Sequence, residues 1–131
     1  MKSRPVYSSI LFLILMDGII LLLVTFIGFA SHSTSLAGGR WLATFLPMLA
    51  GWLVAGWLGG VFHPDISTDY RQLWRVMGCA ALAAPFGAVL RGLWLQNVVM
   101  PVFALVMMAV SAVGLLIWRV IWIAWITRKQ V

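Results

Sequence analysis

The sequence predicts an all-α integral membrane protein of four transmembrane helices, with both termini in the cytoplasm. The 131 residues are 63% hydrophobic and 9% charged, whereas a soluble domain carries about 25% charged residues. Four long apolar runs follow one another, and basic residues gather in alternate connections. Because so few polar side chains cannot cover a water-soluble core, we expect residues 1–131 to form a single transmembrane domain.

Each apolar run meets the length of about 20 residues that a spanning helix needs. The expected spans are residues 8–30, 40–62, 73–95 and 98–126. Pro64 is expected to end the second span, and Ser67, Thr68 or Asp69 to cap the third. Lys2, Arg4 and a small-residue end at Gly28 resemble a cleavable signal peptide, but the run exceeds the usual apolar segment of about 7–15 residues, so we expect it to be retained.

Basic residues set the orientation of a membrane protein. Four spans place both termini on one side, which then collects most of the Lys and Arg residues, namely Lys2, Arg4, Arg71, Arg75, Arg128 and Lys129. The opposite side holds Arg40 and Arg91. This asymmetry predicts that the termini and the loop of residues 63–72 are cytoplasmic.

Small residues recur at four-residue spacing in the two middle spans. They are Gly51, Ala55 and Gly59 in the second span and Ala80, Ala84, Ala88 and Gly92 in the third. Helices in lipid associate through close backbone approach at such positions. We therefore expect the second and third spans to form the tightest helix pair.

Two charged residues fall at compatible depths within the expected spans. Asp17 lies about 14 Å and Arg119 about 10 Å from the cytoplasmic ends of their helices, at about 1.5 Å per residue. One hypothesis is an ion pair between the first and fourth spans, which would offset part of two desolvation costs. The alternative is that Arg119 snorkels to the headgroups while Asp17 is protonated and hydrogen-bonded.

At the outer side, His32 follows the first span and Arg91 lies near the end of the third. Together they could line a vestibule that binds an anionic headgroup or a carboxylate. His32 could instead ligate the metal of a pigment or an iron, but a single histidine in a polar loop is more often a solvated or capping residue. We expect no metal site and no cofactor.

Three tryptophans, Trp118, Trp122 and Trp125, recur at spacings of four and three, so they share one face of the last helix. A row of residues at the membrane interface is the simpler interpretation. A stacking surface for a pigment, a quinone or a partner helix is the alternative.

Several function classes are disfavoured by the sequence. The net charge of +6 comes from dispersed bases rather than a basic run, so we expect no nucleic-acid binding. The single cysteine, Cys79, cannot form a disulfide within the chain. No catalytic triad, Walker loop, dinucleotide fingerprint or CxxC motif occurs, so we expect no enzymatic activity.

The pattern resembles the DUF3054 family of small prokaryotic membrane proteins, whose function is not established. The residues that carry the resemblance are Asp17, Gly28, His32, Pro47, Trp52, Trp74, Gly87, Arg91 and Trp118-Arg119. The resemblance implies four transmembrane helices, a polar set made of Asp17, His32, Arg91 and Arg119, and a place in a bacterial or archaeal plasma membrane. It implies no activity.

We therefore expect an accessory or structural subunit of a larger membrane assembly, in contact with lipid and with other membrane proteins or further copies of itself. One alternative is an oligomeric small transporter or channel that uses Asp17 with Arg91 or Arg119. Another is a protein that binds a lipid, quinone or pigment between its helices.

Overall fold

The protein is all-helical in its computed structural model, which describes residues 6–31, 39–96 and 101–129. The elements in chain order are α1 (Val6–Ser31), α2 (Arg40–Gly59), α3 (Pro64–Ser67), the 3₁₀ helix η2 (Tyr70–Gln72), α4 (Leu73–Leu95) and α5 (Pro101–Lys129). Stretches of four helices are long and apolar enough to cross a membrane, namely Ile10–Gly28, Trp41–Gly59, Tyr70–Leu95 and Ala104–Arg128. This confirms the expected all-α class with four helices of membrane-spanning length.

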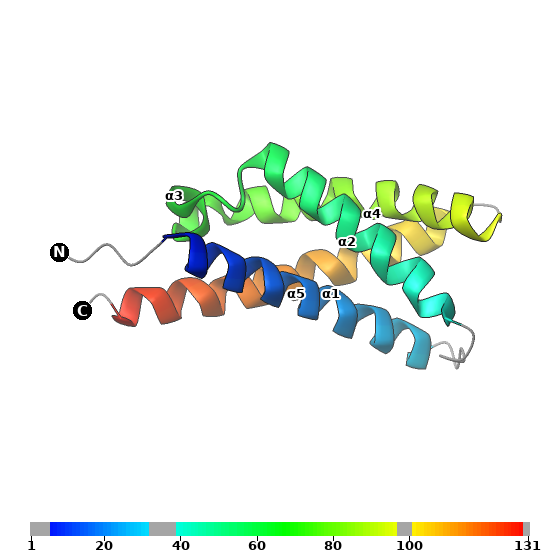
Figure 1. Ribbon diagram of the computed structural model, residues 1–131, viewed down its shortest axis with the longest axis horizontal. Coiled ribbons are helices and arrows are strands. Elements are labelled where there is room, and N and C mark those ends of the chain that lie inside the picture. The colour runs from blue at the N-terminus through cyan, green and yellow to red at the C-terminus, as the bar shows by residue number, and fades with distance from the viewer. Residues whose placement is uncertain (1–5, 32–38, 97–100, 130–131) are drawn as a thin grey trace.

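The four long helices lie side by side, and α1 begins at the end of the molecule where α5 ends, beside α3 (Figure 1). In space, the main contacts connect α1 to α2, α2 to α4, α4 to α5 and α5 back to α1. Consecutive long helices therefore run in opposite directions, and the first and last become neighbours. This places residues from opposite ends of the sequence at the same level of the structure.

The most extensive contact joins α2 and α4, and small residues allow it. A Cβ added to Gly51 would lie only 2.9 Å from the carbonyl oxygen of Ala83, and one added to Gly87 would lie 2.8 Å from the sulfur of Met48. The two backbones approach closely because these positions carry no side chain. The expected tight pairing of the second and third spans is thus confirmed.

The second helix ends at Gly59, three residues before the expected end at residue 62. Gly60 has φ +73°, its N–H bonds to the carbonyl of Trp57, and the N–H of Val61 bonds to the carbonyl of Gly56. This is the Schellman arrangement, which uses glycine because its left-handed backbone is strained for other residues. The prediction that Pro64 ends this helix is therefore wrong.

The connection between α2 and α4 contains local helices that the sequence did not lead us to expect. Pro64 occupies the first turn of α3, where its missing N–H costs no hydrogen bond. The side chain of Asp69 accepts a hydrogen bond from the backbone N–H of Arg71 at 2.9 Å and so caps η2, which leads directly into α4. The prediction that Ser67, Thr68 or Asp69 caps the third span is therefore wrong, because the N-cap position of α4 is Gln72, which makes no side-chain cap bond, and Asp69 caps the short η2 before it.

The bounds of the other long helices agree with the expected spans to within a few residues. α4 has the expected bounds, whereas α1 extends two residues further at its start and one at its end. α5 is described from Pro101, so the expected start at residue 98 lies outside the described residues. Its end at Lys129 is three residues later than expected.

Candidate functional site

A buried ion pair joins the first and last long helices. The Nη2 atom of Arg119 on α5 lies 2.7 Å from Oδ2 of Asp17 on α1, and Nε of the arginine donates to Oδ1 at 3.3 Å. Asp17 is 0% and Arg119 1% exposed. Two parallel bonds from one guanidinium to one carboxylate form the bidentate geometry that makes such pairs strong and directional. The structure therefore contains the paired arrangement, and Arg119 does not extend to the end of its helix.

The helix directions explain why these two residues meet. Asp17 lies 11 residues from the start of α1, and Arg119 lies 10 residues from the end of α5. At 1.5 Å per residue, the two positions are about 16 Å and about 15 Å from the same end of the molecule. Since α1 and α5 are neighbours, equal depth places the two side chains opposite each other.

A third nitrogen of Arg119 reaches the turn that ends α2. Its Nη1 donates to the carbonyl oxygen of Val61 at 2.8 Å, and Val61 is fully buried. This carbonyl lies beyond the last residue of α2, so it is not used within that helix. The glycine turn at Gly60 thus supplies a backbone acceptor for the arginine, and the network includes α1, α5 and the end of α2.

Aromatic side chains complete the surroundings of the pair. The indole N–H of Trp52 on α2 donates to Oδ2 of Asp17 at 3.1 Å, and Trp52 is 0% exposed. The guanidinium carbon of Arg119 lies 5.9 Å from the ring centre of Trp52 and 5.8 Å from that of Phe62. Both distances are within the range of a cation–π contact. The two rings meet edge to face, with centroids 6.0 Å apart.

Each charge of the pair has several partners from the same chain. Asp17 accepts three hydrogen bonds and Arg119 donates three. A charge within a membrane is costly unless it is paired and hydrogen-bonded, and here each condition is met by residues of the same chain. Because the pair is closed to its surroundings, its evident chemical effect is to hold α1, α2 and α5 in one relative position.

Arg91, the other expected site residue at an outer end, contacts α2. Its Nε donates to the hydroxyl of Thr44 at 2.9 Å, and Thr44 is 2% exposed. His32 lies outside the described residues, so the expected vestibule of His32 and Arg91 stays a prediction. Arg91 is on α4 at the end of the molecule away from the ion pair, and the structure does not bring it to Asp17 or Arg119.

The tryptophan stripe of α5 packs against α1. The ring of Phe12 on α1 lies 6.4 Å from Trp118, 5.8 Å from Trp122 and 6.2 Å from Trp125, between ring centres. Trp122 is 3% exposed, and only Trp125 is substantially exposed, at 45%. The stripe thus packs against α1 while Trp125 remains partly exposed, and the interfacial and the stacking-surface interpretations both stay predictions.

Sequence reasoning missed several members of the polar network. Trp52 could have been recognised, because it lies in the middle of an expected span rather than at a membrane interface. Thr44, which accepts the separate hydrogen bond from Arg91, is likewise a polar residue within a span. Val61 binds Arg119 through its backbone oxygen, which the sequence does not reveal. The Gly59-Gly60 pair before it is the one sequence signal that α2 ends there.

The described residues include no group of three or more His, Cys, Asp or Glu side chains placed to hold a metal ion. The fold and the buried pair define a small helical protein of the multi-pass membrane class.

The chain belongs to a family described as "Protein of unknown function (DUF3054)", whose model matches residues 14–122. The match includes Asp17, Trp52, Val61 and Arg119, so the whole buried network lies within the family region. No curated protein and no solved structure matches the chain.

Proposed function

We propose that this protein is a non-enzymatic accessory or structural subunit of a larger membrane assembly. The observation that supports this role is the closed ion pair. Asp17 and Arg119 bind each other and two further groups of the same chain at almost zero exposure. A pair enclosed in this way stabilises a fixed helix arrangement, which suits a protein that presents a constant surface to its neighbours.

The outer surface supports the same role. Large apolar side chains on α2, such as Trp57 at 76% and Leu58 at 74% exposure, point away from the core. In a membrane these side chains contact lipid or another membrane protein. The partners in this proposal are therefore the bilayer and other membrane subunits or further copies of this chain.

The proposed orientation places the end that carries α3 in the cytoplasm. Arg71, Arg75 and Arg128 lie at that end, whereas Arg91 lies toward the other. This distribution supports a cytoplasmic location for both termini by the positive-inside rule. The membrane in this proposal is the plasma membrane of a bacterium or archaeon, as the resemblance to the family implies. A cysteine introduced at Thr68, in a Cys79→Ser background, should react with a membrane-impermeant maleimide only in inverted vesicles. Labelling in intact cells would show that the protein has the opposite orientation.

Purification from native membranes in a mild detergent tests the proposed role. We expect the wild-type chain to migrate with a defined set of partner subunits or as a defined oligomer. Asp17→Asn should disperse this complex because it opens the pair that fixes α1 against α5. Asp65→Asn is the matched control, since Asp65 has a side chain that is 90% exposed and lies in the α2–α4 connection. A chain that always migrates as a monomer would contradict the proposal.

A transporter or channel is a weaker candidate. Its coupling groups would be Asp17 with Arg119 or Arg91, but the first two saturate each other inside the structure. Flux through proteoliposomes that disappears in Asp17→Asn, while the variant remains folded, would favour this alternative. A lipid, quinone or pigment held by the tryptophan stripe receives no support, because Phe12 occupies that face.

A further inference from the structure

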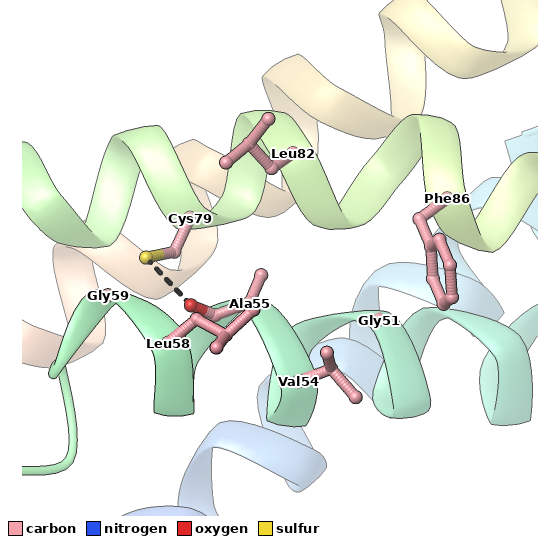
Figure 2. A pocket seen from close by; sticks show the side chains of 8 residues that line it. All are labelled: Gly51, Val54, Ala55, Leu58, Gly59, Cys79, Leu82 and Phe86. Atoms are coloured by element: carbon pink, nitrogen blue, oxygen red, sulfur yellow. Dashed lines mark hydrogen bonds between the residues drawn. The ribbon is translucent and has the colours of Figure 1, made fainter.

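A shallow apolar groove runs along the outer surface between α2 and α4 (Figure 2). Its volume is about 350 Å³, which falls within the range of about 300–1,000 Å³ typical of ligand sites. The lining residues are Gly51, Val54, Ala55, Leu58, Gly59, Cys79, Leu82 and Phe86. The thiol of Cys79 donates to the carbonyl of Ala55 at 3.3 Å, so the one polar side chain of the lining is already bonded.

Two pairs of residues set the shape of the groove. Val54 and Leu58 on one helix, and Leu82 and Phe86 on the other, form the rims and are each at least half exposed. Gly51 and Gly59 carry no side chains, so Phe86 and Cys79 of α4 lie directly against α2 at these two positions and form the floor of the groove. The groove is therefore open along its outer side and has apolar walls along its length.

The positively charged side chain of Arg75 lies at one end of this groove. Arg75 on the first turn of α4 donates from Nη1 to the carbonyl oxygen of Gly59, a lining residue, at 3.2 Å. Its Nε donates to Oε1 of Gln72 at 2.7 Å, and the guanidinium lies 5.0 Å from the ring centre of Trp74. These contacts hold the cation in place, and Nη2 has no hydrogen-bond acceptor among the described residues.

The distance from this cation to the far end of the groove matches one leaflet of a bilayer. Eleven residues of helix separate Arg75 from Phe86, which corresponds to about 16 Å. Half of the hydrocarbon core of a bilayer, about 30 Å thick, is about 15 Å. The cation thus lies where the polar headgroups begin, and the groove ends near the middle of the membrane.

We propose that the α2–α4 groove is a binding site for an anionic phospholipid. An acyl chain lies along the groove, and the phosphate is bound by Nη2 of Arg75. Arg71 is exposed four residues earlier and adds positive charge, while Trp74 and Tyr70, at 65% and 51% exposure, are aromatic residues suited to the headgroup level. This inference does not depend on the proposed subunit role, because it concerns lipid rather than protein contacts.

The charge at the end of the groove favours a lipid over a second copy of the chain. A second copy would need to bring an acidic side chain to Arg75, and each of these side chains already has a partner within the chain: Asp17 binds Arg119, Asp65 lies 3.6 Å from His63, and Asp69 accepts from the backbone N–H of Arg71. An anionic headgroup supplies the missing negative charge without such a residue. The apolar lining excludes a free phosphate or another small hydrophilic anion as the complete ligand.

Photo-crosslinking in a bilayer tests this site. The full chain is reconstituted into phosphatidylcholine vesicles that contain a small fraction of phosphatidylglycerol with a diazirine in its acyl chain. A second preparation uses phosphatidylcholine with the same diazirine. We expect the anionic probe to label peptides of the groove about fivefold more than the zwitterionic probe, the size of effect that one cation near an anionic surface provides.

Three variants and one matched control separate the effect of the charge from that of the groove. Arg75→Gln should remove the preference for the anionic probe, and Arg75→Lys should retain most of it. Arg128→Gln is the matched control, because Arg128 is an exposed cation on α5 at the same end of the molecule. Val54→Trp, a rim substitution that leaves Arg75 and both helix ends unchanged, should block labelling of the groove by both probes.

Two results would overturn the proposal. Equal labelling by the two probes, spread over all lipid-facing helices, would show only ordinary annular lipid. Efficient disulfide dimers of Leu82→Cys, in a Cys79→Ser background, would show that a second copy covers the groove. If Arg75→Gln fails to fold, unchanged groove labelling in Val54→Trp would still refute the site.

Discussion

The ion pair between Asp17 and Arg119 allows a sharp test by a double-mutant cycle. The variants are Asp17→Asn, which keeps the shape of the side chain, Arg119→Met, which keeps much of its volume, and the combination of the two. Each single change leaves the other partner buried at 1% exposure or less without its counter-charge. The reasoning predicts that each single loss is large and that the double loss is much smaller than their sum.

The magnitude follows from the bonds that each variant loses. Arg119 donates three hydrogen bonds, and Arg119→Met removes all of them. Three bonds at about 1–2 kcal/mol each in a membrane give a loss of about 3–6 kcal/mol, which agrees with the usual effect of about 3–5 kcal/mol for breaking a buried pair. Asp17→Asn should cost about 3 kcal/mol, because the guanidinium stays charged. The double variant should cost about 4 kcal/mol, which gives a coupling free energy of at least about 2 kcal/mol.

The measurement is the free energy of unfolding of the purified protein, obtained by titrating mixed micelles with a denaturing detergent and following far-ultraviolet circular dichroism. Arg128→Gln, at an exposed cation on the same helix, controls for a general effect of charge loss. If the two single losses simply add, the residues are not coupled, and the ion pair does not hold α1 and α5 together.

Three further predictions concern the surroundings of the pair and the helix ends. Trp52→Phe removes the indole donor to the carboxylate and should cost about 1–2 kcal/mol in the same unfolding titration, whereas Trp57→Phe, on the exposed side of α2, should change it little. Gly60→Ala places a side chain at φ +73° and should lower the free energy of unfolding by about 1–2 kcal/mol. Gly78→Ala lies in a helix with open space around it, so it should be neutral or stabilising. A thermal denaturation series compares the two variants. Phe12→Ala should shift the tryptophan emission spectrum, since Phe12 contacts the three rings of the stripe, and an unchanged spectrum would argue against that packing.

Much of the fold follows from the sequence by simple physical rules. Length and hydropathy predicted four spanning helices, and the third was placed at residues 73–95 with its observed bounds. Counting residues along the helices placed Asp17 and Arg119 at similar depths, and their ion pair was one of the two alternatives that this count predicted. Small residues at four-residue spacing predicted the closest helix pair.

The contacts that the sequence could not predict depend on which helices are neighbours in the bundle. Periodicity showed that Trp118, Trp122 and Trp125 share a face, but it could not show that the face turns toward Phe12 on α1. Val61 accepts the hydrogen bond from Arg119 through its backbone oxygen, and every residue type carries such an oxygen. In both cases the missing information is which helix lies beside which, and helical spacing within one segment does not contain it.

The pairing of the first helix with the last has a consequence for synthesis of the chain. Asp17 lies 35 residues before Trp52 and 102 residues before Arg119. At about 5–20 residues per second, the carboxylate waits about 5–20 s for its cation. During that time α1 contains an acid whose first partner is an indole from α2. A chain that stops before α5 therefore lacks the cation that pairs with this acid, and its carboxylate keeps only the indole of Trp52 as a partner.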